Sequence, residues 1–182
     1  MAGSIKVDVS DFVNVHLAMV DISTELETKI IYLTLNRVGD MVYTQIKRLL
    51  SKETAIRPGL VAEKLDKKVA HPGRLKYEII GRSGFTKITR ALFGAADIGE
   101  GVAHRAWGRE QIAVGAFMIG DRAVRREAGR ILSLWGPSIP REMVRGESQE
   151  TAEVTVERVM LPRLLHEIDR ATKNAKGKYH LN

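Results

Sequence analysis

The longest regular pattern of apolar positions lies between residues 24 and 51. Apolar side chains recur there at steps of three and four residues, which lines one face of a helix: Ile31, Leu35, Val38, Val42, Ile46 and Leu49. Ser23 and Thr24 are suitable N-terminal caps, and a residue that precedes proline avoids the helical region. The pattern therefore predicts one long helix that begins near Thr24 and ends before Pro58, with a break at Gly39 as an alternative.

A second amphipathic pattern lies near the C-terminus. It predicts a helix over Ser148–Ala171 in which Leu161, Leu165 and Ile168 share one face. Pro162 either bends this helix or starts a new segment. The following stretch, about residues 173–182, is basic and polar and is expected to be a mobile tail.

Between these helices the apolar runs are short and bounded by glycine and proline, which is typical of strands. Strands are predicted at Ser4–Val9, Leu75–Ile80, Thr86–Phe93, Val102–Trp107, Ile112–Ile119 and Ile131–Trp135. Short helices are predicted over Asp11–Met19 and Leu60–Lys68. The charged stretch Asp121–Arg130 is interpreted as a loop or a helical turn, and Gly136–Pro140 as irregular because it holds two prolines and a glycine.

Strands clustered between helices favour an α+β fold. We expect a long N-terminal helix and a C-terminal helix packed on a mostly antiparallel sheet. Residues 1–182 are expected to form a single domain with a flexible N-terminal arm, about residues 1–10, and the basic tail.

Composition narrows the class of protein. Hydrophobic residues make up 44% and charged residues 28%, as in ordinary globular proteins, and no cysteine is present to form disulfides or thiolate metal sites. No apolar run reaches the ~18 residues of a membrane span. The net charge of +7 permits contact with nucleic acid, an acidic membrane surface or an acidic protein, but an aromatic content of 5% argues against a base-stacking surface.

No motif in the sequence predicts catalysis, a cofactor or a metal. His166-Glu167 lacks the second histidine of a zinc helix, and Gly99 and Gly101 lack the third glycine of a dinucleotide loop because His104 stands there. The acidic pairs Asp97/Glu100 and Glu147/Glu150 lie in polar segments that would not desolvate them, so solvated surfaces are expected.

Four arginines within nine residues are the strongest basic feature: Arg122, Arg125, Arg126 and Arg130. Guanidinium groups bind phosphates and carboxylates equally well. The stretch is therefore either a contact for DNA or for an acidic protein partner, or simply a solvated segment.

Three segments of the C-terminal half resemble the minor tail protein Z family of long-tailed phages and prophages. They are Gly101–Arg109 (GVAHRAWGR), Gly115–Met118 (GAFM) and, most specific, Leu134–Met143 (LWGPSIPREM), followed by the amphipathic stretch Arg163–Arg170. The N-terminal half fits the family only loosely. The resemblance implies a structural protein at the upper end of the tail, where tail and head meet, with no catalytic residues and no cofactor.

The centre of the third segment is the candidate interaction site: Trp135, Gly136, Pro137, Ser138, Ile139 and Pro140. Prolines stiffen the chain and cannot donate to a sheet. The segment either closes the core of the subunit at a sheet edge or docks on a neighbouring subunit. We expect Trp135 to be largely buried and the prolines to run extended after a strand.

The sequence thus predicts a virion protein of the tail-completion type, needed to join tail to head. Its expected partners are the tail terminator, tail tube and head-completion proteins, other copies of itself in a ring that we expect to be a hexamer, and packaged DNA, but no membrane. It would be found in the virion neck, and in the host cytoplasm during assembly. The alternatives are a basic nucleic-acid-binding module, a tail terminator-type ring protein or a tail-associated hydrolase.

Overall fold

A computed structural model describes residues 4–7, 24–82, 84–145 and 147–179 of the chain. The chain divides into two compact units, each assembled from separated stretches. Unit 1 comprises Met1–Ser4, Ile46–Asp66 and Ile80–Gln149, and unit 2 comprises Ile5–Gln45, Lys67–Ile79 and Glu150–Asn182. The long helices and antiparallel sheets confirm the α+β class, whereas the single-domain organisation stays a prediction.

The long N-terminal helix is confirmed as α2 (Thr24–Thr54), which runs through Gly39 without a break. The expected apolar face is buried at its centre, where Leu35, Val38, Val42 and Ile46 are inaccessible to solvent. The prediction of a preceding helix over Asp11–Met19 lies outside the described residues. The strand predicted at Ser4–Val9 is found as β1 (Ser4–Val7).

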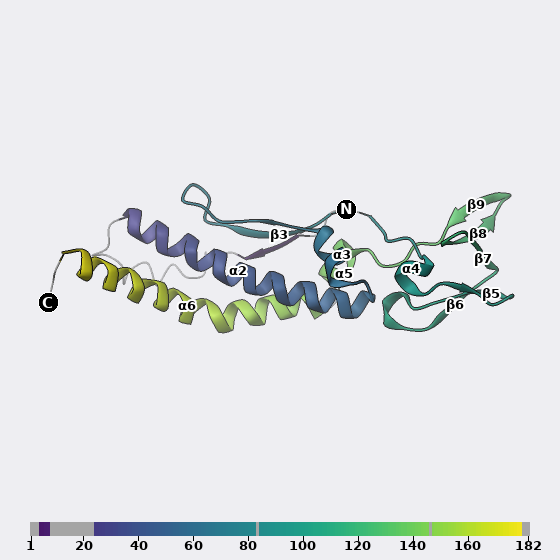
Figure 1. Ribbon diagram of the computed structural model, residues 1–182. Helices are drawn as coiled ribbons and strands as arrows, with labels where there is room; N and C mark the ends of the chain where they lie inside the picture. The colour runs from purple at the N-terminus through teal and green to yellow at the C-terminus, as the bar shows by residue number, and fades with distance from the viewer. Residues whose placement is uncertain (1–3, 8–23, 83, 146, 180–182) are drawn as a thin grey trace. The chain divides into compact units, whose positions relative to one another are not determined.

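In unit 2, α2 packs against the C-terminal helix α6 (Glu147–Tyr179), which runs in the opposite direction (Figure 1). Ile30 and Leu164 form a buried cluster, against which Leu26, Ile168 and Ala171 pack. The predicted inner face of α6 is therefore wrong at two positions, because Leu161 and Leu165 are exposed and the buried residues are Met160 and Leu164. The helix continues through Pro162 and extends past the predicted end at Ala171.

A buried carboxylate joins the two helices of unit 2. Only 3% of the Glu167 side chain is exposed, and its Oε1 lies 3.0 Å from Arg37 Nε of α2 and 3.3 Å from Arg163 Nη2. Arg170 Nη1 lies 4.0 Å from the other carboxylate oxygen. A buried charge is tolerated only when it is paired, and the three arginines together provide that pairing for Glu167.

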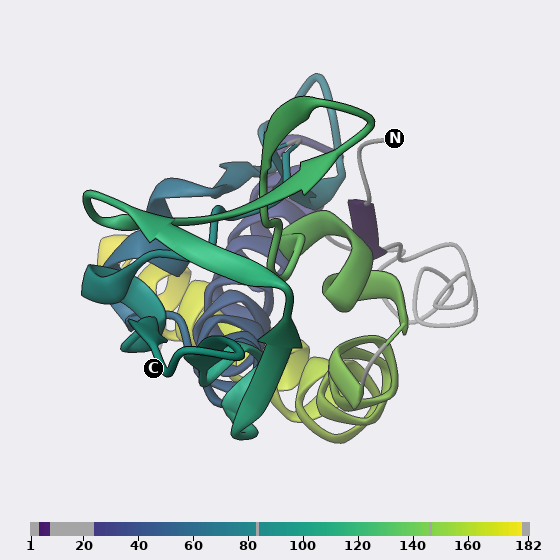
Figure 2. The same cartoon turned by 90° about the vertical axis from the view of Figure 1, so that its right-hand side faces the viewer.

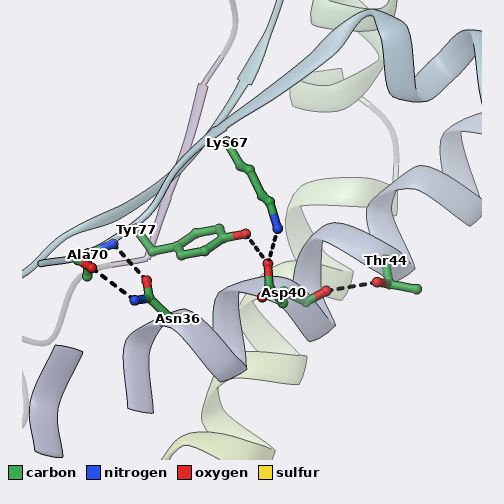
Figure 3. Close-up of polar contacts among 6 residues, drawn as sticks. All are labelled: Asn36, Asp40, Thr44, Lys67, Ala70 and Tyr77. Atoms are coloured by element: carbon green, nitrogen blue, oxygen red, sulfur yellow. Dashed lines mark hydrogen bonds and ion pairs between the residues drawn. The ribbon is translucent and has the colours of Figure 1, made fainter. Parts of the chain in front are cut away.

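A hairpin lies against the middle of α2 through polar contacts with two residues one helical turn apart (Figure 3). Asn36 donates to the carbonyl of Ala70 at 2.9 Å and accepts from its amide at 2.7 Å. One oxygen of Asp40 accepts from Lys67 Nζ at 2.5 Å and from the Tyr77 hydroxyl at 2.8 Å. These contacts hold the strands β2 (Leu65–Lys68) and β3 (Tyr77–Gly81), which with β1 form a sheet of order β1-β3-β2.

The shared oxygen shifts both acidic groups of this network. Burial opposes ionisation of Asp40, but the hydrogen bonds from Lys67 and Tyr77 outweigh it, so the pKa of Asp40 lies below its ordinary value. Burial and the neighbouring Asp40 carboxylate raise the pKa of Tyr77. Asp40 is therefore charged and Tyr77 protonated at neutral pH, the states that the hydrogen bond requires.

Unit 1 contains two three-stranded antiparallel sheets, drawn in teal and green in Figure 2. The first consists of β4 (Ala96–Asp97), β5 (Gly101–His104) and β6 (Gln111–Val114), and the second of β7 (Ala116–Ile119), β8 (Arg122–Glu127) and β9 (Arg130–Ser133). The short helices are α3 (Pro58–Glu63), α4 (Arg90–Phe93), the 3-10 turn η3 (Ala106–Gly108) and α5 (Ile139–Arg145).

Several predicted elements of unit 1 require correction. The charged stretch Asp121–Arg130 is the hairpin of β8 and β9, and not a loop or helical turn. The strand predicted over Thr86–Phe93 gives way to α4, because the Thr89 hydroxyl caps the amide of Leu92 and Gly94 ends the helix in the left-handed conformation. The helix predicted over Leu60–Lys68 ends at Glu63 and is followed by strand β2. The single strand predicted over Ile112–Ile119 is two strands, because Gly115, with a φ of 72°, separates β6 from β7.

A buried histidine makes the stability of unit 1 dependent on pH. Burial lowers the pKa of His104, and its Nδ1 accepts the amide of Ala106 at 3.3 Å, which requires a neutral ring. The folded-state pKa is lowered, so this contribution is present above the unfolded pKa of ~6.5 and is lost as pH falls below it. Between pH ~7.5 and ~5, the urea midpoint of the wild-type protein should therefore fall more than that of His104→Gln. His166→Gln is the control, because His166 is exposed, and equal falls in all three proteins would contradict the prediction.

Candidate functional site

The segment Gly136–Pro140 is buried and lies inside unit 1. It pairs with the stretch before α4: the amide of Gly136 donates to Thr86 O at 2.6 Å, and the amide of Thr86 donates to Pro137 O at 2.9 Å. Ser138 O then accepts the amides of Arg141 and Glu142 at 3.0 and 2.9 Å. Of the two roles considered for this segment, closing the core is the one that its contacts support.

Gly136 is closely packed, and no positive φ marks it as a turn glycine. A Cβ atom there would lie 3.3 Å from Thr86 O and 3.4 Å from side-chain atoms of Ile88 and Phe93. Ile139 and Pro140, predicted to be extended, begin helix α5. Proline is favoured in a first helical turn, where its missing amide costs nothing, and this explains why the prediction of an extended course fails there.

Trp135 contradicts the prediction of burial, because 53% of its surface is exposed. The ring lies outside the core with the Lys87 ammonium 5.5 Å from its centroid, which is cation–π geometry. The two residues are also paired in the backbone. Buried side chains of Ile88 and Phe93 lie beside the neighbouring Gly136, whereas the tryptophan contributes to the surface.

An open groove of about 440 Å³ runs beside this ring. It is lined by residues 131–135 together with Lys87, Arg125 and Glu127, and we refer to it as the Trp135 groove. Ile131 and Leu132 are 50% and 46% exposed, so the lining combines exposed apolar residues with charged ones. Contiguous exposed apolar surface of this kind marks interaction sites more often than chance positions do.

The four arginines all lie on the β8–β9 hairpin, but only Arg125 lines the groove. Arg122, Arg125 and Arg126 belong to β8, and Arg130 begins β9. Arg125 lines the groove, donates to Val114 O at 3.3 Å and lies 3.8 Å from Glu127. Arg122, Arg126 and Arg130 are exposed, and no carboxylate within the described ranges forms an ion pair with them.

Sequence reasoning did not identify Lys87, Ile131 and Leu132 as parts of the site. The turn between β8 and β9 is Ala128-Gly129, both with positive φ, and alanine is an unusual residue for that conformation. Without an Asn-Gly or Asp-Gly signal, the hairpin could not be distinguished from a charged loop. The sequence signal that could have identified this part of the site is the run Arg130–Ser133, which places two apolar residues on an edge strand.

None of the acidic residues considered for catalysis lines the Trp135 groove. Asp97, Glu100, Glu147 and Glu150 are exposed, as expected for solvated carboxylates. Across the described ranges, no group of three or more His, Asp or Glu side chains is placed to hold a metal ion. Nor does any helix of that part of the chain have both the length and the apolar character needed to cross a membrane.

The geometry therefore gives one candidate surface, made of the Trp135 groove and the arginines of the β8–β9 hairpin. Its chemistry suits a protein contact, because it combines an exposed aromatic anchor and two aliphatic side chains with guanidinium groups, three of which have no ion-pair partner among the described residues. No protein-family model matches the chain, and comparisons with curated proteins and with solved structures give no significant match.

Proposed function

We propose that this chain is a structural virion protein of a tailed phage, a minor tail protein of the tail-completion type that acts where tail and head are joined. The proposal assigns no catalytic residue and no cofactor. It starts from the resemblance of Gly101–Arg109, Gly115–Met118 and Leu134–Met143 to the minor tail protein Z family. All three segments fall in unit 1.

The observation that carries the proposal is the exposure of Trp135 at the end of its strand. The five residues that follow Trp135, Gly136–Pro140, are buried, so the segment combines a core role with an exposed aromatic anchor. A large apolar ring left in solvent serves binding better than stability. Tryptophan and arginine are the residues most enriched among the anchors of protein interfaces.

Deletion of the gene from the phage or prophage that encodes this chain tests the proposal. Filled heads and complete tails should accumulate unjoined, as seen by electron microscopy of the lysate. A plasmid copy should restore joined particles, and labelled antibody fragments against the protein should mark the neck. Joined, infectious particles at normal yield without the gene would overturn the proposal.

Complementation with point variants then tests the surface. Trp135→Ala should lower the yield of joined particles by about tenfold or more, as expected for loss of an aromatic anchor. Val154→Ala is the matched control, because Val154 is 54% exposed on α6. Normal yield with Trp135→Ala would show that the ring has no role in docking.

A nucleic-acid contact by Arg122, Arg126 and Arg130 is a second candidate. It predicts that the purified protein binds duplex DNA with an affinity that falls steeply with salt. Replacing Arg122, Arg126 and Arg130 with glutamine should then abolish that binding, and absence of salt-sensitive binding by the wild-type protein would remove this candidate.

A further inference from the structure

We propose that the exposed face of the sheet β4-β5-β6 binds the same face of a second copy of this chain. The sheet lies wholly within unit 1, where Figure 1 labels β5 and β6. Its strands are antiparallel, and paired residues of neighbouring strands lie on the same face. The inference does not rest on the proposed function, because it concerns a contact between purified molecules.

The face that this sheet turns to solvent is entirely apolar. Its residues form two rows across the three strands: Ala96, Ala103 and Ile112 in the first, and Ile98, Gly101 and Val114 in the second. Val114 is 69% exposed, Ile112 49% and Ile98 45%. On the opposite face, Val102 and His104 are buried. Because the outer face of such a sheet normally carries polar residues, these rows indicate an interaction surface.

The sizes of the residues in the two rows suit contact between two copies. The central strand offers only Ala103 and Gly101, and a Cβ atom at position 101 would clash with Ala113 O. When two such faces meet with their strands reversed, the first row of each copy lies over the second row of the other. Ile98 then lies over Ala96 of the second copy, and Ala103 over Gly101. Facing sheets pack well when large side chains meet small ones.

One end of the sheet is acidic. Asp97 and Glu100 lie at the turn between β4 and β5, and both are exposed. Arg125 donates to Val114 O at this end, but Glu127 lies 3.8 Å from the same guanidinium group. The two carboxylates of the turn therefore give this end a net negative charge.

The other end of the sheet, at the turn between β5 and β6, is basic. Arg105 lies 3.8 Å from Glu110, whereas no ion pair within the described ranges involves Arg109. Reversal of the strands places the basic end of each copy beside the acidic end of the other, so the ends attract each other twice. The apolar rows hold no cation for a phosphate group, which argues against a nucleic acid as the occupant. A second copy supplies both an uncharged face and ends of the opposite charge.

Analytical ultracentrifugation of the intact chain tests the contact at protein concentrations from about 1 to 500 µM, the range of a weak dimer. The wild-type mass should rise from that of one chain to that of two. Val114→Glu should weaken association about tenfold or more, because Val114 would lie over Ile112 of the second copy and the carboxylate would be buried there. Val154→Glu is the control and should dimerise like the wild type, because Val154 is 54% exposed on α6.

Charge reversal provides a second arm. Glu100→Arg should weaken its own dimer several-fold because it brings basic ends together, and Arg109→Glu should do the same by bringing acidic ends together. Mixed in equal amounts, the two variants should form a mixed dimer as tight as that of the wild type. Recovery on mixing separates attraction between the ends from damage to the fold, because a misfolded variant would not be rescued by a second altered chain.

Three outcomes would overturn the proposal. The first is a wild-type mass of one chain at every concentration. The second is a dimer that Val114→Glu leaves unchanged, since such a dimer would use another surface. The third is binding of single chains to uncharged lipid vesicles that is lost in Val114→Glu, which would make lipid the occupant. None of these outcomes bears on the proposed function, which fails if particles assemble normally without the gene.

Discussion

Replacing Gly39 with alanine should lower the thermal midpoint of the helical signal by about 6–12 °C, the shift expected for a loss of about 3 kcal/mol in a chain of this size. A Cβ atom at position 39 would lie 2.4–2.5 Å from three ring carbons of Tyr77. The ring is buried, and its hydroxyl is held by Asp40, so it cannot move aside without breaking that bond.

The control is Gly59→Ala in helix α3. A Cβ atom there would meet nothing within 4 Å, and alanine favours a helix by up to ~1 kcal/mol over glycine. Gly59→Ala should therefore leave the midpoint unchanged or raise it slightly. An unchanged or raised midpoint for Gly39→Ala would contradict the close packing of the Tyr77 ring on α2.

Ile139→Ala should destabilise unit 1 by about 2–5 kcal/mol, whereas Trp135→Ala should cost about 1 kcal/mol or less. Ile139 is completely buried, so truncation leaves a cavity in the core. Trp135 loses mainly its contact with Lys87. Urea unfolding followed by circular dichroism gives both values, and equal losses would indicate that the ring of Trp135 is part of the core.

The different expected stabilities of these two variants also help to interpret a failure to join heads and tails in the complementation experiments. A defect in joining caused by Ile139→Ala reports loss of folded protein, and the same defect caused by Trp135→Ala reports loss of a contact. Soluble protein recovered from the cells at wild-type level is the check that separates them.

The parts of the fold that follow from local periodicity were predictable from the sequence. The core face of α2 is one of them, because Leu35, Val38, Val42 and Ile46 recur at helical spacing and all are buried. The antiparallel pair β5 and β6 is another, because two apolar runs flank a turn at Gly108–Gln111.

Features that depend on a distant partner were not predictable. Helix α6 offers leucines at 161, 164 and 165, and only its packing against Ile30 selects Leu164 for the interior. Trp135 has an apolar neighbour on its N-terminal side and suits a core position, but its side chain is 53% exposed, whereas Ile139 and Phe93 are buried. Gly39 suggested a break in the helix, and its packing partner Tyr77 lies 38 residues away.

Individual residues of the candidate site were predictable from the sequence, but their arrangement was not, because it depends on contacts between strands. Composition alone identified the four arginines, and the resemblance identified Trp135. The groove beside Trp135, which only Arg125 of the four lines, depends on the β8–β9 hairpin, whose Ala128-Gly129 turn gives no strong sequence signal.

The ion-pair cluster around Glu167 has a consequence for how this chain tolerates sequence change. Arg37, Arg163 and Arg170 share one carboxylate, so loss of any single arginine leaves two cations to neutralise it. Loss of the carboxylate leaves three cations on facing helices with nothing between them. Substitutions at the arginines are therefore expected to accumulate one at a time, whereas position 167 can change only together with several of its partners.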